Sequence, residues 1–438
     1  MSSSHDSAAH LWNKALDLIP GGNMLLSKNR NLFSPGRWPT YYTKAKGPHV
    51  WDLDNTKYLD FSTNGVGACS LGHANELVDE HVIAAIKNGV MSTLNSPAEV
   101  SLAQTLISLH PWAEMARFAR SGGEANAVAI RIARAASGRD KVAICGYHGW
   151  HDWYLAANLS DNSNLDAHLL EGLSPVGVPQ SLTGTIVPFR FNNFDDLKLL
   201  DNPELAAVKM EVVRSEPPLP NYLETIRSIC TKNNTILIFD ECTSGFREAF
   251  GGIHLNYDVM PDMCMLGKAL GNGFAISAVL GRRAIMEYAS KSFISSTFWT
   301  EAVGPVAALA TLEQMRAQQS WKILPALGKD VKKIWTKYAS QYSIPLQITG
   351  IDALPTFQFK TPNPLACKTY FTELMLTKGF LSSNLFYPTT SHRPSHLALY
   401  EEAIADVFST ISRCLSDNLD FDTLCAGGPC RPTFQRLN

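Results

Sequence analysis

The sequence predicts an α/β fold, with a large domain built on a mostly parallel central sheet and a smaller α+β domain formed from both chain ends. The length of 438 residues is enough for two or three domains. From about residue 75 to residue 325, helical stretches alternate with short apolar runs, which is typical of a parallel sheet. The run at residues 235–239 carries no charge, as expected of a strand covered on both faces.

Residues 1–70 are expected to pack with the small domain. Apolar positions at residues 11–19 have helical spacing, and Pro20-Gly21-Gly22 ends that helix. Two strand-like runs follow at 49–54 and 57–61, separated by Asn55-Thr56. Because short strands separated by two turn residues are typical of a hairpin, we expect an antiparallel pair here.

Residues 71–325 are expected to form the large domain. Its predicted strands are the apolar runs at residues 141–145, 206–213, 235–239, 263–266 and 276–280. Residues 326–438 are expected to form the small domain and a tail. This region has a helix after about residue 325, strand-like pieces at 346–349 and 356–360, and a final helix near 395–415.

The composition argues against several classes of partner. A hydrophobic content of 45% and a charged content of 18% are typical of a folded enzyme. The net charge of -2 gives no general attraction to nucleic acid or to an anionic membrane. The amino terminus has no signal-peptide pattern, and no apolar stretch is long enough to span a bilayer. We therefore expect a soluble, cytoplasmic protein with no nucleic-acid or membrane partner.

Most of the nine cysteines stand alone in apolar runs, as small buried hydrophobes do. Cys425 and Cys430 differ, because they lie in a Gly-rich segment near the end of the chain. Their spacing lacks the second pair that a zinc site needs. We expect a loose tail there and no metal site.

Asp240 and Lys268 carry the main functional prediction. Asp240 follows one predicted strand, and Lys268 follows the next, after residues 263–267. Ligands of parallel sheets collect at the carboxyl ends of the strands. A lysine there can condense with an aldehyde, and a neighbouring carboxylate can hold a protonated pyridine nitrogen. This pair therefore fits pyridoxal 5'-phosphate (PLP), although an isolated Asp and Lys would more simply be a loop cap and a solvated lysine.

A phosphate site is suggested by Ser121-Gly122-Gly123-Glu124, which precedes a helical stretch. Ser121 and Glu124 have the spacing of a capping box, and the two glycines leave backbone amides uncovered at the positive end of the helix dipole. A phosphate could bind there. A well-capped helix without a ligand explains the same residues.

The strand ending at Cys145 leads into Tyr147, His148 and His151. The ring of Tyr147 is placed to stack on a flat cofactor. The two histidines have no nearby third ligand, so a structural or substrate-facing role is favoured over a metal. The sequence has no Walker motif or complete dinucleotide fingerprint, which argues against nucleotide use.

Five motifs occur in the order and spacing of a known family. They are Ser121-Gly-Gly-Glu-Ala, Tyr147-His-Gly, Ser215-Glu-Pro, Phe239-Asp-Glu-Cys-Thr-Ser-Gly-Phe-Arg and Leu266-Gly-Lys-Ala-Leu-Gly-Asn-Gly. Over about residues 10–415 the sequence resembles the class III PLP-dependent aminotransferases. Ile19-Pro-Gly-Gly and the Thr-Ser-Gly-Phe-Arg stretch resemble the glutamate-1-semialdehyde aminomutase branch.

The resemblance implies the PLP-dependent transferase fold type I and a homodimer with a shared active site. It implies that Lys268 forms the internal aldimine and acts as the base, and that Asp240 pairs with the pyridinium nitrogen. It further implies a pyridoxamine phosphate intermediate between an amino donor and a carbonyl acceptor. The other implied cofactor-binding residues are Ser121, Gly122, Gly123, Tyr147, Glu216, Asn221, Cys242 and, toward the neighbouring subunit, Thr297.

The substrate-binding residues are less defined, because this sequence departs from the aminomutase branch. The loop that supplies an arginine for the substrate carboxylate is longer here and offers Lys28, Arg30 or Arg37. Asn64, in a replaced loop beside the cofactor, and His148 are further candidates. We therefore expect transamination between two molecules in preference to mutase activity. A PLP racemase or decarboxylase, and a non-catalytic protein on this fold, remain alternatives.

Overall fold

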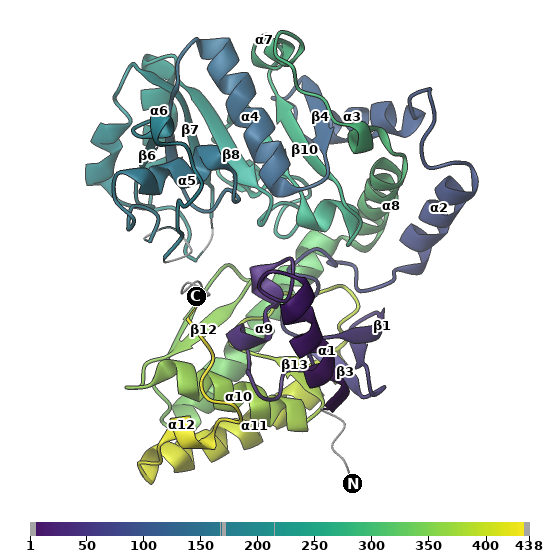
Figure 1. The fold of residues 1–438 in the computed structure, drawn as a ribbon, viewed down its shortest axis with the longest axis vertical. Coiled ribbons are helices and arrows are strands. Elements are labelled where there is room, and N and C mark those ends of the chain that lie inside the picture. Colours follow the sequence, from purple (N-terminus) through teal and green to yellow (C-terminus); the bar gives the residue numbers. More distant parts are fainter. Residues whose placement is uncertain (1–5, 167, 169–171, 214, 433–438) are drawn as a thin grey trace. The chain divides into compact units, whose positions relative to one another are not determined.

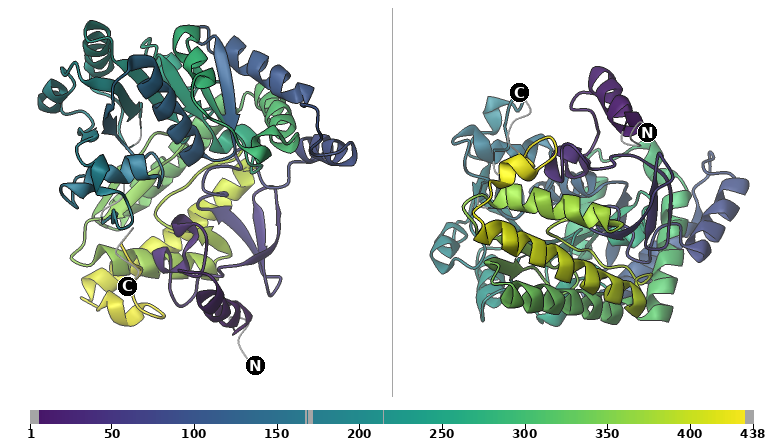
Figure 2. Two further views of the ribbon diagram at one scale, coloured as in Figure 1. Left: turned by 45° about the horizontal axis from the view of Figure 1, so that its top comes forward. Right: turned by 90° about the horizontal axis from the view of Figure 1, so that it is seen from below.

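The computed structural model describes residues 6–166, 168, 172–213 and 215–432. The chain divides into two compact units, Glu76–Trp321 and Met1–Asn75 with Lys322–Asn438 (Figures 1 and 2). We call them the central unit and the terminal unit. The boundaries drawn from sequence at residues 70 and 325 remain a prediction about domains.

The central unit contains a seven-stranded sheet in the order β4-β10-β9-β8-β7-β5-β6. Strand β10 is antiparallel to both of its neighbours, and the pairs from β9 to β6 are parallel. This confirms the α/β fold with a mostly parallel sheet. The strands are β4 Met115–Ala119, β5 Lys141–Cys145, β6 Ile186–Pro188, β7 Leu205–Glu211, β8 Ile236–Glu241, β9 Met263–Leu266 and β10 Ser277–Gly281.

Helices flank this sheet, and α4 lies across one face of it (Figure 1). Alanine, valine and isoleucine residues of α4 pack against apolar side chains of the strands. Contact with such a helix explains why β7 and β8 are buried along their whole length. The α-helices of this part are α2 Glu76–Lys87, α3 Pro97–Leu109, α4 Gly122–Ser137, α5 Asp152–Leu155, α6 Tyr222–Lys232, α7 Arg283–Met286 and α8 Val303–Gln318.

Two strands of the sheet were not predicted from sequence. Strand β4 contains Arg117 and is only partly buried along most of its length, so it has no continuous apolar run. Strand β6 is three residues long and ends in Pro188. Its place at the sheet edge is where a proline is tolerated.

The terminal unit is built from both ends of the chain. Strand β13 (Phe380–Ser382) pairs in parallel with β3 (Lys57–Phe61), and β3 pairs antiparallel with β2 (His49–Asp52). The expected hairpin and the small α+β domain from both chain ends are thereby confirmed. The remaining strands are β1 Tyr42–Lys46, which extends this sheet, and the separate pair β11 Leu346–Thr349 and β12 Thr356–Phe359.

The helices of the carboxyl-terminal region enclose an aromatic core. Figure 2 shows α10 (Pro364–Thr377) and α11 (Pro394–Ser416) side by side. The other α-helices are α1 Asp6–Leu18, α9 Ser320–Gln341 and α12 Phe421–Leu424. Short 3-10 helices lie at Leu26–Lys28, Arg30–Leu32, Ala156–Leu159, Gln180–Leu182, Phe194–Leu199, Ile253–Asn256, Lys268–Gly271, Glu287–Ser290 and Thr297–Thr300.

The expectation of a loose tail around Cys425 and Cys430 is wrong. Both side chains are buried, and the amide of Cys430 donates a 2.6 Å hydrogen bond to Thr369 Oγ1. The sulfur of Cys425 lies 3.4 Å from the carbonyl oxygen of Ala366. The segment therefore packs against α10, and all nine cysteines are free thiols.

Among the described residues, no helix combines the length and the apolar character needed to cross a membrane.

Candidate active site

Asp240 lies near the carboxyl end of β8, in the middle of the central sheet. Its side chain is buried and accepts two hydrogen bonds, from His148 Nδ1 at 2.8 Å and from the Cys242 amide at 3.1 Å. The ammonium nitrogen of Lys209, on β7, lies 3.6 Å from the same carboxylate oxygen that His148 contacts. Asp240 is therefore held in one orientation by groups from two neighbouring segments.

These partners keep Asp240 ionised. Burial raises the pKa of Asp240, but the charge of Lys209 and the hydrogen bond from His148 lower it by more, so the pKa lies below its ordinary value. Burial also lowers the pKa of His148 despite the bond to Asp240. Both lowered pKa values are consistent with a neutral His148 that donates a hydrogen bond from Nδ1 to an anionic Asp240. A buried carboxylate of this kind can hold a cationic ring nitrogen.

Lys268 follows β9, the strand next to the one that carries Asp240, and is the first residue of a 3-10 helix. Its Nζ donates a 2.7 Å hydrogen bond to Thr243 Oγ1, three residues beyond Asp240. The side chain of Lys268 is half-buried. The backbone of Lys268 has φ +40°, a left-handed conformation that non-glycine residues seldom adopt and that is concentrated at functional sites.

The start of α4 has the predicted capping box. Ser121 Oγ accepts the Glu124 amide at 3.3 Å, and Glu124 Oε2 accepts the Ser121 amide at 2.8 Å. The first amides of a helix have no partner within the helix, so Gly122 and Gly123 can present theirs to an anion. A Cβ on Gly122 would lie 3.2 Å from the Cys242 sulfur, and one on Gly123 would lie 2.8 Å from His151 Cε1.

His151, for which the sequence favoured a structural or substrate-facing role, lies near the start of α4. Its Nδ1 is buried and has no hydrogen-bond partner among the described residues. The same atom would lie 3.0 Å from a Cβ on Gly123, so it lies beside the glycine pair. An unpartnered buried nitrogen next to free helix amides fits an anionic group such as a phosphate. Together with Asp240 and Lys268, the residues present fit PLP.

Tyr147 and Cys242 lie close to this arrangement. The amide of Tyr147 donates to Glu211 Oε2 at 3.1 Å, and its ring is edge-on to Tyr154, with centroids 5.9 Å apart. The Cys242 sulfur lies between the positions that Cβ atoms on Gly122 and Gly267 would take, at 3.2 and 3.4 Å. Burial raises the pKa of the Cys242 thiol well above its ordinary value, which keeps it neutral.

Three other predicted cofactor residues are exposed. Glu216 accepts a 3.2 Å hydrogen bond from Asn192, and Asn221 stands before α6 with φ +64° and makes no side-chain cap bond. Thr297 begins the 3-10 helix Thr297–Thr300. Arg120 holds this segment beside the start of α4, because it donates to the Trp299 carbonyl at 2.9 Å and pairs with Glu301 at 2.8 Å.

The sequence did not predict a place in the site for Glu211 or Lys209. Both are buried and lie on β7, next to the strand that carries Asp240. In the ladder between β7 and β8, Glu211 is the Cα partner of Asp240. The available signal was the presence of two charged residues inside the otherwise apolar run at 205–213.

The substrate candidates Lys28, Arg30 and Asn64 belong to the terminal unit. Lys28 is exposed, whereas Arg30 is only 8% exposed and its Nε has no partner among the described residues. Asn64 is buried with φ +44°, and its amide donates to the carbonyls of Asp60 at 3.0 Å and Tyr387 at 2.8 Å. A further candidate, His148, lies in the central unit, fully buried against Asp240.

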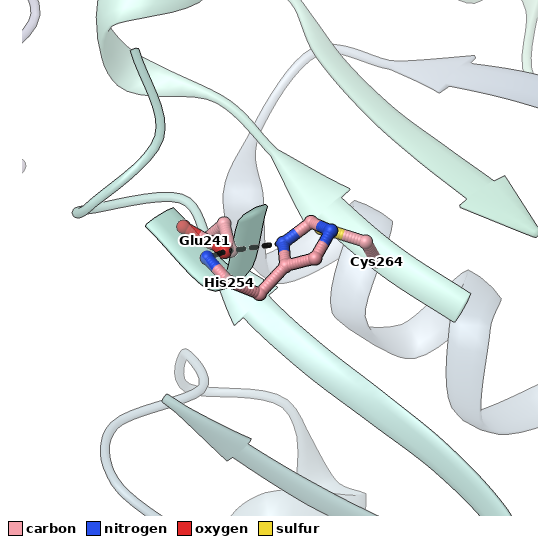
Figure 3. Close-up of side chains that lie close together, drawn as sticks. All are labelled: Glu241, His254 and Cys264. Atoms are coloured by element: carbon pink, nitrogen blue, oxygen red, sulfur yellow. Dashed lines mark hydrogen bonds and ion pairs between the residues drawn. The ribbon is translucent and has the colours of Figure 1, made fainter. Parts of the chain in front are cut away.

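A buried cluster of Glu241, His254 and Cys264 resembles a metal-ligand set in composition (Figure 3). His254 Nδ1 donates to Glu241 at 2.7 Å, and His254 Nε2 accepts the indole N–H of Trp112 at 2.9 Å. Glu241 also accepts the Ser244 hydroxyl at 2.7 Å. Both ring nitrogens are thus used within the protein, and the cluster is a hydrogen-bond network that supports the end of β8.

Comparison with known proteins places this geometry in context. The sequence matches the aminotransferase class-III family over residues 34–415. A 3-aminobutyryl-CoA aminotransferase of Cloacimonas acidaminovorans (strain Evry) is 31% identical over 421 residues, covering 92% of this chain and 97% of that protein. A glutamate-1-semialdehyde 2,1-aminomutase of Methanosphaera stadtmanae is 31% identical over 366 residues, covering 81% and 83% respectively.

Among solved structures, the FumI protein of Sphingopyxis sp. MTA144, in its PLP internal aldimine form, has the same fold with a TM-score of 0.84. The two sequences are 23% identical, and the match covers 93% of this chain and 97% of that one.

Proposed function

The chain belongs to the class III aminotransferase family and is a PLP-dependent enzyme, and we propose that it transfers an amino group between an amino acid or amine and a carbonyl acceptor, with Lys268 as its catalytic amine. The observation that carries the proposal is the hydrogen bond from the Lys268 amine to Thr243. Thr243 lies three residues after Asp240, whose carboxylate is buried. The amine of Lys268, after β9, and the ionised carboxylate of Asp240, on the neighbouring strand β8, supply both groups that PLP chemistry needs.

Each cofactor-binding role follows from the contacts of one residue. Asp240 binds the ring nitrogen and keeps it protonated, a charge-assisted contact of about 1.5–3 kcal/mol. The amides at Gly122 and Gly123 and the Nδ1 of His151 bind the phosphate. Ser121 supports them by fixing the start of the helix.

Other side chains enclose the ring of the cofactor. Tyr147 covers one face, and Cys242, whose sulfur lies beside Gly122 and Gly267, covers the other. Glu211 anchors the backbone of Tyr147 through its carboxylate. We assign this support to Glu211 and give Glu216 no contact with the cofactor, because Glu216 is exposed.

When bound, PLP supplies an aldehyde for amine exchange and an electron-withdrawing ring. Lys268 is the residue that would hold the cofactor, through Nζ, until a substrate amine takes its place. The free Nζ amine would then move a proton from the substrate carbon to the former aldehyde carbon, a general-base role worth about 10²- to 10⁴-fold. Thr243, as the hydrogen-bond acceptor of Nζ, orients that amine between the two tasks.

A homodimer is part of the proposal. Apolar side chains of the central unit are exposed on and around α2, α3 and the Thr297 segment. They include Leu77, Ile83, Ile86, Leu94, Val100, Phe293 and Phe298. A run of exposed apolar residues is typical of a protein–protein interface. We propose that a second copy covers this surface, that Thr297 contacts the cofactor phosphate of the second copy, and that the dimer works in the cytoplasm.

Arg30 is the proposed ligand of a substrate carboxylate. A buried guanidinium with an unpartnered Nε fits a carboxylate, whereas Lys28 is exposed. His148 is reassigned from substrate contact to the orientation of Asp240, because it is fully buried against that carboxylate. We propose that Asn64 fixes its loop, since its amide already binds two carbonyls.

Intramolecular amino transfer of the aminomutase type is the second candidate. It is supported by the 31% identity to a glutamate-1-semialdehyde 2,1-aminomutase. We favour transfer between two molecules, because the aminotransferase relative matches a larger share of this chain, 92% against 81%.

The test mixes PLP-loaded protein with a panel of amino acids and amines and follows the cofactor absorbance. A transaminase loses its absorbance with one donor and recovers it only when a carbonyl acceptor is added. A mutase rearranges one substrate without an acceptor. Racemisation or decarboxylation without amino transfer, or no absorbance change with any donor, would contradict the proposal.

A further inference from the structure

Lys209 is a fully buried lysine in the middle of β7, with a relative exposure of 0%. Its strand neighbours Val208 and Met210 are apolar and equally buried. Lysine is almost never fully buried unless it is paired. A buried ammonium without a partner would cost several kcal/mol, so the chain must compensate this charge.

The available partners of Lys209 come from the adjacent strands. Its Nζ lies 3.6 Å from Asp240 Oδ2 on β8 and 3.9 Å from the sulfur of Met265 on β9. Burial raises the pKa of the nearby Cys242 and Cys264 thiols well above its ordinary value, so both stay neutral and neither offers Lys209 a counter-charge. Asp240 is the one carboxylate among these groups and therefore the counter-ion of Lys209.

Other ionisable groups surround the pair from the β5 side and the end of β7. His148 Nδ1 donates a hydrogen bond to the same Asp240 oxygen, and the charge of Glu211 acts to raise the pKa of His148. His148 is neutral in this setting, and Glu211, whose Oε2 accepts the Tyr147 amide, cannot carry a positive charge, so neither is a counter-ion for Asp240. Lys209 is thus the cation that stabilises Asp240 when no cofactor is present.

We propose that Lys209 is a positioning residue that holds Asp240 ionised in the cofactor-free protein and competes with the cofactor ring nitrogen for its charge. The proposal rests on the function proposed above, in which Asp240 binds that nitrogen. In the free protein, the ammonium stabilises the carboxylate. In the loaded protein, two cations share one carboxylate and repel each other, so Lys209 stabilises the free form more than the loaded form.

The consequence is that Lys209 weakens cofactor binding and keeps the empty site formed. Replacing Lys209 by methionine, which has a similar shape and no charge, removes the competing cation. PLP should then bind about 10-fold more tightly, because a like charge has been removed from a low-dielectric site. The free protein should melt at a lower temperature, because Asp240 loses its counter-ion.

The experiment measures the dissociation constant of PLP and the melting temperature of free and loaded protein for the wild type and Lys209→Met. Lys141→Met is the matched control, since Lys141 begins the neighbouring strand β5 and forms an exposed pair with Glu204. Tighter PLP binding in Lys209→Met alone, with a larger rise in melting temperature on loading, supports the proposal. An unchanged or weaker affinity in Lys209→Met overturns it.

A double-mutant cycle keeps the proposal testable if Lys209→Met folds poorly. Asp240→Asn alone leaves the buried ammonium unpaired, whereas Asp240→Asn with Lys209→Met removes both charges. We expect the double variant, free of cofactor, to melt at a higher temperature than Asp240→Asn. Additive effects of the two changes would show that Lys209 only fills space. Failure of PLP to bind the wild type would instead contradict the proposed function, which separates the two outcomes.

Discussion

The Nζ of Lys268 donates a 2.7 Å hydrogen bond to the Oγ1 of Thr243, so that a lysine after β9 is fixed to the loop that follows β8. The backbone of Lys268 takes a left-handed conformation at φ +40° at the start of its 3-10 helix. The amine of Lys268 is thereby held on the segment that begins with the buried carboxylate of Asp240.

Asp240→Asn is expected to weaken PLP binding by about 10- to 100-fold, because a charge-assisted hydrogen bond contributes about 1.5–3 kcal/mol. Absorbance titration of the cofactor-free protein with PLP measures this change. Asp195→Asn is the control, since Asp195 is exposed at the start of a 3-10 helix. Equal affinities of Asp240→Asn and the wild type would exclude Asp240 as the partner of the ring nitrogen.

Gly123→Ala is expected to weaken the binding of PLP by roughly 5- to 30-fold, corresponding to about 1–2 kcal/mol of lost amide and dipole contact. The added methyl would lie 2.8 Å from His151 Cε1, so the ring must move away from the helix start. Pyridoxal, which has no phosphate, is the matched ligand. If the variant weakens both ligands equally, the glycine pair does not bind the phosphate.

Much of the sheet could be predicted from the sequence because buried parallel strands leave continuous apolar runs. The strands β5, β7, β8, β9 and β10 have this pattern, whereas β4 is only partly buried and β6 has three residues. The hairpin of β2 and β3 was equally visible, since Asn55-Thr56 lies between two short runs.

The environment of Asp240 could not be predicted in the same way. Which side chains touch it depends on the order β7-β8-β9, and that order is set by crossover connections that sequence spacing does not reveal. The sequence therefore predicted no role for Lys209 and Glu211, and it indicated His148 as a substrate-binding residue when its partner is Asp240. The prediction of a loose tail around Cys430 was wrong because a Gly-rich composition indicates flexibility, whereas the hydrogen bond of Cys430 to Thr369 depends on a contact between distant parts of the sequence.

The stability of the protein is expected to fall in acid through His110. This fully buried residue donates from Nδ1 to the Leu106 carbonyl at 2.8 Å and accepts the Gly252 amide at Nε2. Burial lowers the pKa of His110 to about 4. The unfolded chain takes up the proton near pH 6.5, so the contribution is complete above about that pH and is lost as the pH falls toward 4.

Urea unfolding between these pH values measures the effect, which should reach about 3 kcal/mol. His110→Gln should make this part of the profile less steep, although not flat, because burial also lowers the pKa of His168 and His392 to about 4. His10→Gln, at an exposed site, should leave the profile unchanged. A profile of the same slope in His110→Gln would show that another group causes the loss.

Arg30→Met is expected to raise the KM for donors that carry a carboxylate by about 10- to 100-fold and to leave amines without a carboxylate unaffected. The buried Arg30 Nε has no partner among the described residues, whereas Lys28 is exposed. Lys28→Met is therefore the matched control. A larger effect of Lys28→Met than of Arg30→Met in steady-state kinetics would assign the carboxylate to the lysine.

The most direct test of the account is to find which lysine carries the cofactor. PLP-loaded protein is reduced with borohydride, digested and mapped by mass spectrometry, with Lys268→Ala as the control and circular dichroism to check that the variant is folded. We predict a single cofactor-modified peptide containing Lys268, absent from the variant. Modification at another lysine, or none at Lys268, would contradict the proposed function.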